Sequence, residues 1–458
     1  MNLRRTSEKL VDSLFARINY ERQNKLGPHE FKLANMKRFL ERLGNPHLNF
    51  PVVHVAGTKG KGSVSAIVGA ILKSAGLKTG VYSSPHLERV NQRIRINGGE
   101  VSDIGLHQAL AKLAPAIDEF DTFADQTESK KLTFFEVITA AACQVFTDEE
   151  ADAVVLEVGM GGRLDSTNIC QPVISVITNI SLDHTRQLGS SVDKIAFEKA
   201  GIIKPGVPVV SGVTNPAAAK VIRDIANENG SELFEREADF HCRTTDKPGF
   251  FDYESETLQL ADLQLAMIGK HQQINASIAI AVIEMLIKKG WEIHSNKIRS
   301  GLGEAILAGR CELVPGQKLV VLDMAHNEAS MQALAKTLQQ DVPGFAVASK
   351  KTMIVAVSQE KDLAAMLQPM IGLFDSFVVT KYVDNPRARS CQEIESCLSQ
   401  LLAAAGKSTD CVTVVEDPAA AWRLAETGSD ADSAICVTGS VFLVAELRPL
   451  ALNSTISR

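Results

Sequence analysis

The sequence predicts an α/β protein with two domains. The larger N-terminal domain is expected to have a phosphate loop and a doubly wound, mostly parallel sheet, and the smaller C-terminal domain to be Rossmann-like. Short β-branched runs alternate with helical segments in both halves of the chain, a pattern typical of parallel sheets covered by helices. A glycine-rich loop, Gly57–Ser63, follows the first of these strands. The 458 residues suffice for about two to four domains at roughly 150 residues each.

The first elements form a strand–helix–strand unit around this loop. Val52–Ala56 is a β-branched run that the glycines interrupt, and Ser63 can cap the helix that follows. A stripe of apolar residues at helical spacing predicts a helix that ends at Gly76. The stripe consists of Val64, Ile67, Val68, Ile71 and Leu72. A second strand is predicted at Thr79–Ser83.

The rest of the N-terminal half continues this alternation and then departs from it. Strands are predicted over residues 153–158, 173–178 and 207–211, and helices over residues 134–146 and 217–227. From Phe234 to Met267, alternating residues around a Lys-Pro-Gly turn are typical of antiparallel hairpins. A long apolar helix over residues 272–289 follows.

A second α/β alternation begins after this helix. Its strands are predicted over residues 319–322, 353–357, 377–380, 412–415 and 434–437, with helices between them. We place the boundary near Ala308–Glu312, which predicts one domain over residues 1–309 and another over residues 310–458.

Composition and charge exclude several classes of protein. Hydrophobic residues make up 45% and charged residues 22% of the chain, which excludes a disordered protein. The net charge of −6 gives no basic excess for binding nucleic acid. No apolar run approaches the ~18 residues that span a bilayer, and the start of the chain lacks a signal peptide's apolar region. The eight scattered cysteines include no C-x-x-C pair, so we expect reduced thiols in a soluble, cytoplasmic protein.

The glycine-rich loop reads Gly57-Thr-Lys-Gly-Lys-Gly-Ser63. Glycines let backbone N–H groups turn toward phosphate oxygens, and the N-terminus of the next helix adds positive potential. Lys61 is expected to reach the β- and γ-phosphates, and Ser63 to offer a hydroxyl to Mg²⁺. In the usual G-x-x-x-x-G-K-[ST] pattern the lysine and the hydroxyl residue are adjacent, whereas here Gly62 separates Lys61 from Ser63. A glycine-rich turn that binds nothing is the alternative, but two lysines and a hydroxyl among glycines favour ATP binding.

This variant loop resembles that of folylpolyglutamate synthases, which belong to the Mur ligase superfamily of ATP-dependent amide-forming ligases. Further motifs similar to the family's follow in its order. They lie at Ser83–Leu87, Asn91–Asn97, Leu156–Asn168, Asn179–His184, Glu198–Lys204, His271–Asn275, Gly309–Arg310 and Asp323–Asn327. Two positions depart from the family pattern. Lys59 occupies a loop position that is often Asn, and Met324 replaces the usual Gly of D-G-A-H-N.

The resemblance implies an ATP-dependent acid–amino-acid ligase. ATP would phosphorylate a pteroate or folate carboxylate, and the amine of L-glutamate would attack the acyl phosphate to give an amide, ADP and phosphate. The implied cofactors are ATP and two Mg²⁺ ions, and a monomer acting on small molecules is expected.

A Mur-type cell-wall amino acid ligase is the alternative, although it shares neither the S-P-H-L loop nor the G-G-R-L-D-S-T-N run. A non-catalytic P-loop module and a small-molecule kinase are two further readings. The sequence leaves open whether dihydrofolate synthase and polyglutamylation activities are both present, and which folate form and chain length are preferred.

Residues for metal binding are suggested by position and by resemblance. Glu157 ends a buried strand, and ligands of open α/β sheets bind at the carboxyl ends of strands. Its hard oxygens suit Mg²⁺, although a salt-bridged structural glutamate is the alternative. The resemblance carries Mg²⁺ binding onto Ser84, Glu157 and His184, with a water-mediated contact left open for the histidine. Without the resemblance, His184 would more often be an ordinary histidine in a loop.

Lys199 belongs to the E-K-A-G-I motif. In similar ligases the corresponding lysine is carbamylated by CO₂, and the new carboxylate orients a second Mg²⁺. This chemistry needs a neutral amine, hence a pKa lowered by burial or nearby cations. The alternative is a surface lysine paired with Glu198. With Lys61 and His184, Lys199 completes the expected catalytic set.

Nucleotide and glutamate contacts are expected on both predicted domains. The loop residues Gly57, Thr58, Gly60, Lys61, Gly62 and Ser63 are assigned to ATP. The amide of Asn275 suits adenine's N6 and N7 edge, Arg310 is expected to clamp phosphates, and Asp323 reaches the nucleotide by resemblance. His326 is expected to face phosphates or the incoming glutamate. Ser440 is expected to hold glutamate or, alternatively, only to cap a helix.

Folate contacts are harder to assign. Two N-terminal segments, Asn19–Arg22 and Leu26–Arg38, resemble the region that lines the folate pocket in this family. Phe134, Phe135 and Glu136 are also expected to line it. For Phe39 and Leu40, helical core packing is the simpler reading. Among the candidate contacts to the nucleotide, capping of their own helix is an equal alternative for His271 and Gln272.

Overall fold

The computed structural model describes residues 10–18, 33–127, 131–245, 247, 249–383 and 385–456. The described chain divides into two compact units. The first holds the described residues up to Thr245 together with Phe250–Ala266 and Gln273–Ala305, and the second holds Met267–Gln272, residues 247 and 249, and everything from Ile306 onward. Within this part of the chain, no helix has the length and apolar character needed to cross a membrane.

The first unit is built on an eight-stranded sheet with the strand order β4-β3-β2-β5-β1-β6-β7-β8. Six of these strands pair in parallel, while β3 and β4 extend one edge as antiparallel strands. The strands are β1 (Val52–Ala56), β2 (Thr79–Tyr82), β3 (Ile94–Ile96), β4 (Gly99–Glu100), β5 (Ala153–Glu157), β6 (Ile174–Ile177), β7 (Val209–Ser211) and β8 (Leu233–Glu235). Every residue of β1, β5 and β6 is buried, as expected for strands covered on both faces. The predicted doubly wound, mostly parallel sheet is therefore confirmed.

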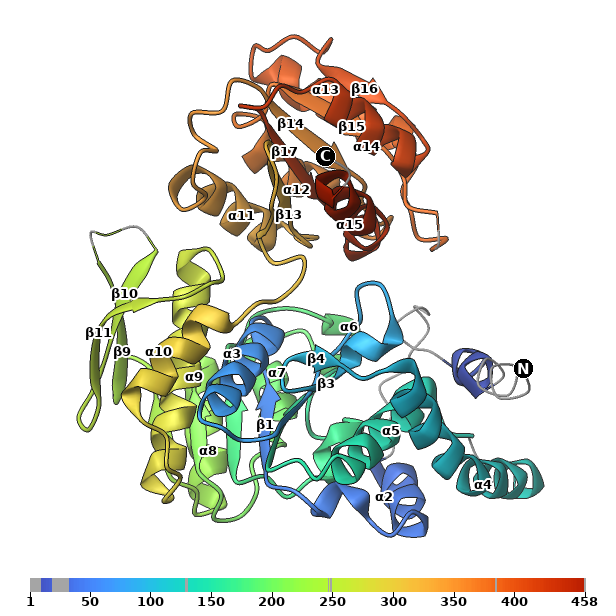
Figure 1. The fold of residues 1–458 in the computed structure, drawn as a ribbon, viewed down its shortest axis with the longest axis vertical. Helices are drawn as coiled ribbons and strands as arrows, with labels where there is room; N and C mark the ends of the chain where they lie inside the picture. Colours follow the sequence, from blue (N-terminus) through green and yellow to red (C-terminus); the bar gives the residue numbers. More distant parts are fainter. Residues whose placement is uncertain are drawn as a thin grey trace. The chain divides into compact units, whose positions relative to one another are not determined.

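The helices of this unit include α3, which lies on the sheet and packs against α10 (Figure 1). They are α2 (Leu33–Arg42), α3 (Lys61–Ser74), α4 (Asp103–Thr127), α5 (Phe134–Asp148), α6 (Thr185–Leu188), α7 (Val192–Ala200), α8 (Pro216–Glu228), α9 (Lys270–Lys288) and α10 (Ser295–Glu304). The 3-10 helices are η1 (Pro46–Leu48), η2 (Val90–Arg93) and η3 (Ser166–Ile169). The start of α5 is fixed by a capping box between Thr133 and Glu136, which satisfies two backbone N–H groups.

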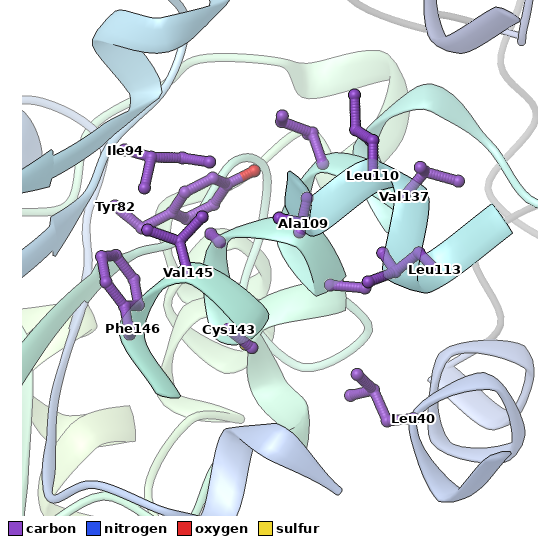
Figure 2. Packing of buried hydrophobic residues seen from close by; sticks show 14 of the residues in the cluster. Leu40, Tyr82, Ile94, Ala109, Leu110, Leu113, Val137, Cys143, Val145 and Phe146 are labelled. Carbon is purple, nitrogen blue, oxygen red and sulfur yellow. The ribbon is translucent and has the colours of Figure 1, made fainter. Parts of the chain in front are cut away.

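A dense apolar core lies between β2, β3, α4 and α5. Figure 2 shows Tyr82 and Ile94 packed beside Val145 and Phe146. Packing here leaves no space for a side chain at residue 80. A Cβ atom at Gly80 would lie 2.6 Å from the ring of Phe146, so glycine is needed where helix and strand approach so closely.

The segment from β9 to β11 forms a separate antiparallel sheet of three strands. These are β9 (Phe240–Thr244), β10 (Phe250–Ser255) and β11 (Gln259–Gln264), which confirms the predicted hairpins. The buried carboxylate of Glu284 on α9 accepts hydrogen bonds from the hydroxyls of Tyr253 at 2.5 Å and Ser255 at 2.6 Å. Thr257 donates to the same carboxylate. These bonds fix the small sheet on α9.

The second unit has a six-stranded sheet with the order β12-β13-β17-β14-β15-β16, in which only β12 is antiparallel among the described strands. Its strands are β12 (Glu312–Val314), β13 (Leu319–Leu322), β14 (Lys351–Val355), β15 (Ser376–Val379), β16 (Val412–Val414) and β17 (Ala434–Thr438). The helices are α11 (Glu328–Gln340), α12 (Leu363–Leu367), η4 (Gln368–Met370), α13 (Cys391–Ala404), α14 (Pro418–Thr427) and α15 (Val441–Ile456). The smaller α/β fold predicted for this half is confirmed.

Candidate active site

The glycine-rich loop connects β1 to α3, as the sequence predicts. Gly57 and Gly60 have φ angles of 152° and 82°, in the region that favours glycine. A Cβ atom at Gly57 would lie 1.9 Å from Thr178 Oγ1, and one at Gly60 would lie 2.4 Å from Asn275 Oδ1. Gly60 caps α3, and Lys61 is the helix's first residue. The loop therefore lies at a helix N-terminus, where backbone N–H groups and the helix dipole favour an anion.

The loop is held by the segment that follows β6. The backbone N–H of Thr58 donates to Asn179 O at 2.9 Å. The hydroxyl of Thr58 donates to Ser181 O at 3.2 Å and accepts from Ser181 N at 3.1 Å. At Lys59, the backbone N–H donates to Asn179 Oδ1 at 2.8 Å, and the carbonyl accepts from Thr178 Oγ1 at 2.6 Å. Two motifs far apart in the sequence thus form one structure at the carboxyl edge of the sheet.

The three residues of the expected catalytic set influence one another. Lys199, on the last turn of α7, is 4% exposed. Burial, then the charge of Lys61, lowers the pKa of Lys199 to about 7. Burial also lowers the pKa of His184 against the opposing attraction of Asp183, and Lys61 and Lys199 lower it further. Both shifts arise first from burial, and the neighbouring ammonium groups add positive charge of the kind that attracts an anion.

Lys61 and Asn275 lie at the loop itself. The Lys61 ammonium donates to Gly57 O at 3.1 Å, so its side chain folds over the loop. Asn275 stands on α9, and its amide occupies the space beside Gly60 that a side chain would fill. The predicted nucleotide contacts of the first unit are therefore brought together.

Two predicted metal ligands follow neighbouring strands. Glu157 ends β5, is 4% exposed, and accepts a hydrogen bond from the backbone N–H of Ser84 at 3.3 Å. Ser84 follows β2, which pairs in parallel with β5. A buried carboxylate beside a hydroxyl-bearing residue is a donor set that fits Mg²⁺.

His184, the third predicted ligand, directly precedes α6 as its N-cap residue, in a left-handed conformation with φ of 49° and ψ of 39°. Among the described residues, no three His, Cys, Asp or Glu side chains are grouped to hold a metal ion. The predicted set contains only two residues of these types, Glu157 and His184, so it depends on the hydroxyl of Ser84 and on a modified Lys199.

The loop of residues 159–168 packs against the turn that carries Lys199. A Cβ atom at Gly162 would lie 2.8 Å from the carbonyl oxygens of both Glu198 and Lys199. The backbone N–H of Arg163 donates to Glu198 O at 2.7 Å, and its guanidinium donates to Glu198 Oε1 at 2.8 Å. Glu198 therefore pairs with Arg163, and the alternative in which Lys199 is a surface lysine paired with Glu198 is not what the structure contains.

A buried hydrogen-bond chain inside this loop was not predicted. Asp165 accepts from Met160 N at 2.9 Å and from Thr167 Oγ1 at 2.6 Å. Because the Thr167 hydroxyl donates to Asp165, the His54 ring must donate its Nε2–H to Thr167, at 2.9 Å. Burial lowers the pKa of His54 to about 3, so the ring is neutral. The D-S-T-N run at residues 165–168 is the sequence signal that could have revealed this chain, but no role was predicted for its aspartate and threonine.

In the second unit, the predicted residues follow β13 and β17. Asp323 accepts from the backbone N–H groups of Cys311 and Ala325, both at 2.8 Å. Burial raises the pKa of this carboxyl despite the charge of Arg310. His326 donates its Nδ1–H to Met324 O at 2.8 Å, because a carbonyl only accepts. Its Nε2 is therefore an acceptor when the ring is neutral.

Ser440 and Met324 also follow strands of the second sheet, β17 and β13 respectively. The buried Ser440 follows β17, and its hydroxyl accepts from Phe442 N at 3.2 Å, which matches the helix-cap alternative. Met324, the departure from D-G-A-H-N, has no positive φ, and its backbone N–H donates to Gly309 O at 2.9 Å. A methionine is thus accommodated there without the conformation that requires glycine.

The comparisons with known proteins agree with these motifs. Residues 55–283 match the family described as Mur ligase middle domain, and residues 312–452 match the family described as dihydrofolate synthetase, C-terminal domain. The dihydrofolate synthase/folylpolyglutamate synthase of Bacillus subtilis is 32% identical over 91% of this chain and 94% of its own. The chain belongs to the folylpolyglutamate synthase family.

Other members of the family are similar over most of their length. The dihydrofolate synthase/folylpolyglutamate synthase of Escherichia coli is 32% identical over 86% of this chain and 85% of its own. The crystal structure of folylpolyglutamate synthase from Thermotoga maritima superposes with a TM-score of 0.84 at 30% identity, covering 99% of this chain and 98% of that one. An E. coli structure in complex with DHPP and ADP gives a TM-score of 0.79 at 29% identity, with 98% of each chain covered. These relatives favour the folylpolyglutamate synthase interpretation over a cell-wall ligase.

The residues expected to line the family's folate pocket are only partly described. Asn19–Arg22 and residues 26–32 lie outside the described residues, and the rest of the second segment begins α2. The Phe134 ring is buried beneath the Arg93 guanidinium, whose carbon lies 5.1 Å from the ring centroid. Phe135 packs against the loop at Gly159, where a Cβ atom would lie 2.4 Å from its Cζ.

Three other residues from that part of the sequence have structural roles. Glu136 caps its own helix by accepting hydrogen bonds from the backbone and the hydroxyl of Thr133, each at 2.8 Å. Phe39 and Leu40 are fully buried, which confirms core packing for them. Among the residues Phe134, Phe135 and Glu136 that were expected to line the folate pocket, Phe135 is the one whose ring packs against the loop at Gly159.

His271 and Gln272 lie in the first turn of α9, and these first residues of the helix belong to the second unit, whereas the helix from Gln273 onward belongs to the first. Both stand in a tightly packed turn. A Cβ atom at Gly269 would lie 2.8 Å from the His271 ring, and the backbone N–H of Gln272 donates to Gly269 O at 2.9 Å. Burial, then Arg310, lowers the pKa of His271 to about 4, so its ring is neutral beside the arginine.

Proposed function

We propose that this chain is an ATP-dependent ligase that adds L-glutamate to dihydropteroate, to folate polyglutamate tails, or to both, through an acyl phosphate. The observation that carries the proposal is the gathering of Lys61, His184 and the buried Lys199 beside the glycine loop. Membership of the family, with named synthases similar over most of the chain, supports the same reaction.

The first unit supplies the nucleotide phosphates with donors. The backbone N–H groups at the start of α3 and the Lys61 ammonium belong to the same end of the loop. Lys61 can leave Gly57 O for a phosphate oxygen, since the new contact joins two opposite charges whereas Gly57 O is neutral. We assign the adenine edge to Asn275, whose amide lies against Gly60.

We propose that Glu157, Ser84 and His184 hold Mg²⁺, and that Lys199 is carbamylated to orient a second ion. Mg²⁺ would neutralise charge on the reacting phosphate. Carbamate formation needs an unprotonated amine, and a Lys199 pKa of about 7 supplies one near neutral pH. The contacts of Gly162 and Arg163 with the end of α7 hold the lysine's backbone in one position.

We further propose that residues 1–309 form the ATP- and folate-binding domain and residues 310–458 the glutamate-ligase domain. Arg310 and Asp323 are assigned to the nucleotide, and His326 and Ser440 to glutamate. The hydrogen bond to Met324 O leaves His326 Nε2 as an acceptor that suits an ammonium group. All eight cysteines are free, as expected in a reducing compartment, which supports a cytoplasmic enzyme.

Product analysis tests the function directly. The purified protein is incubated with Mg²⁺-ATP, L-glutamate and either dihydropteroate or tetrahydrofolate, and the products are identified by mass spectrometry. We expect at least one acceptor to gain the mass of one glutamate residue, with ADP formed in equal amount. Turnover of a UDP-muramyl acceptor instead, or phosphate release that ignores glutamate, would contradict the proposal.

A further inference from the structure

Lys59 is the loop residue at which this chain departs from the family pattern. Its ammonium lies 2.9 Å from Asp183 Oδ2. The lysine side chain is 38% exposed and the aspartate side chain 27% exposed, so the ion pair is partly screened but not fully solvated. It connects the phosphate loop to the segment between β6 and α6.

The second oxygen of Asp183 supports His184. Asp183 Oδ1 accepts the backbone N–H of His184 at 3.0 Å and lies 3.9 Å from its Nε2. His184 has the left-handed backbone conformation, which is unfavourable for residues other than glycine. Asp183 therefore links the Lys59 ammonium to a histidine whose conformation needs support.

The backbone of residue 59 is held independently of its side chain. Lys59 N donates to Asn179 Oδ1, and Thr178 Oγ1 donates to Lys59 O. Both bonds use backbone atoms of residue 59, so they do not depend on the lysine side chain. A substitution there removes the link to Asp183 while the loop keeps its anchors, so its effect can be separated from a collapse of the loop.

We propose that Lys59 is a positioning residue that holds His184, through Asp183, in the place where it serves Mg²⁺ and the nucleotide phosphates. The inference rests on the proposed function in one respect, the assignment of His184 to the metal. Partners that orient a metal ligand typically change metal affinity or activity by about 10- to 100-fold when removed. Lys59 lies one step further from the metal, behind Asp183, so we expect the lower end of that range.

A direct contact between Lys59 and the phosphates is the competing explanation, and the two differ in their response to Mg²⁺. A positioning role affects nucleotide binding only when Mg²⁺ is present. An ammonium that touches phosphate oxygens contributes with or without the metal, because its attraction to the anion does not need one.

The experiment measures the affinity of the full chain for a non-hydrolysable ATP analogue by calorimetry, with saturating Mg²⁺ and with a chelator. The variants are Lys59→Met, Lys59→Arg, Asp183→Asn and the double variant Lys59→Met/Asp183→Asn. Lys73→Met is the matched control, since Lys73 stands at the far end of α3 in an ion pair with Glu304 at 3.2 Å. Circular dichroism verifies that each variant is folded.

With Mg²⁺, we expect Lys59→Met and Asp183→Asn each to weaken binding about tenfold. The double variant should be little worse than either single one, because both remove the same link. With the chelator, Lys59→Met should match the wild type within about twofold. Lys59→Arg, which keeps the charge, should recover most of the affinity, and Lys73→Met should change nothing.

Two outcomes would overturn the proposal. Equal weakening of Lys59→Met with and without Mg²⁺ would place the ammonium on the phosphates, and fully additive effects of the two substitutions would show that they do not act through one link. Since the readout is nucleotide binding, the proposal is tested even if the wild type ligates no folate, so failure of the proposed function and failure of the Lys59 role are distinguishable.

Discussion

The carboxyl edges of the two sheets hold their polar residues in different ways. In the first unit, the bonded partners are distant in sequence: Thr58 and Ser181 are 123 residues apart, and Ser84 and Glu157 are 73 apart. In the second unit, the hydrogen bonds of Asp323 to Ala325 and of His326 to Met324 each span two residues. The first edge thus depends on several motifs folding together, whereas the second combines turns with bonds of intermediate span, such as that between Asp323 and Cys311, 12 residues apart. Substitutions should accordingly have wider effects in the first unit than in the second.

The largest effect is expected at Lys61, at the centre of the first edge. Lys61→Ala should lower kcat by about 10²- to 10³-fold, because the ammonium meets charge that grows as the phosphoryl group is transferred. Steady-state kinetics with varied ATP measures this loss, and thermal unfolding verifies that the protein stays folded. A folded variant with near-normal kcat would remove the phosphate-loop assignment.

Lys199 should come next. Lys199→Ala is expected to be inactive if a carbamate is required, and added acetate should restore part of the activity by supplying a carboxylate. At a fixed concentration of dissolved CO₂, wild-type activity should fall as the pH drops through about 7, the pKa of Lys199, because the protonated amine cannot react with CO₂. A fully active Lys199→Ala variant would sink the proposal.

The same lysine affects stability with a defined sign. In the ligand-free, CO₂-free protein its folded pKa of about 7 lies below the ordinary value of 10.5, so between these pH values the unfolded chain binds more protons. The free energy of unfolding contributed by this group should therefore rise with pH from about 7 to 10.5. Urea unfolding of wild type and Lys199→Met across this range tests the sign, since the variant should lack this rise.

His326 tests the second edge. His326→Ala should raise the KM for glutamate by about tenfold through loss of a hydrogen bond to a charged group, while the KM for ATP changes little. Kinetics with each substrate varied in turn measures the two values. The reverse result, a raised KM for ATP alone, would assign His326 to the nucleotide and blur the contrast between the two edges.

The smallest change concerns the buried chain from His54 to Asp165. Thr167→Val keeps the volume but leaves the His54 N–H and an Asp165 oxygen without the hydroxyl, so the free energy of unfolding should fall by about 1–3 kcal/mol. Thr147→Val is the control, because its bond to Pro46 O at 2.9 Å is only partly buried. Urea unfolding measures both variants. Equal losses in the free energy of unfolding would mean that the buried chain contributes no more to stability than a partly buried hydrogen bond.

Much of the fold could be predicted because most of its strands and helices carry a strong periodic pattern. The strand at Leu319–Leu322 and the start of α5 at Phe134 were predicted at the residues observed. The two- and three-residue strands β3, β4 and β12 were missed, since so few residues show no alternation. Helix α4 was also missed, although its buried residues recur at helical spacing: Leu106, Ala109, Leu110, Leu113, Ile117 and Phe120.

For the site, the sequence supplied the residues but not their pairings. The loop, Lys199 and Asn275 were singled out from their motifs, and the structure brings them to one edge. The bond between Lys59 and Asp183 and the chain from His54 to Asp165 join residues more than a hundred positions apart. Such pairs depend on how β1, β5 and β6 lie side by side, which a single sequence does not reveal.

The contact between Gly60 and Asn275 limits which residues the loop can hold. Any side chain at residue 60 would overlap the Asn275 amide, and shortening Asn275 would still leave the left-handed backbone at residue 60. No single compensating change can therefore open this position, and in a saturation library residue 60 should stay glycine among all active clones. Residue 59, one position away, has no such restriction on its backbone or on the space for its side chain, because Lys59 reaches Asp183 across a partly exposed gap.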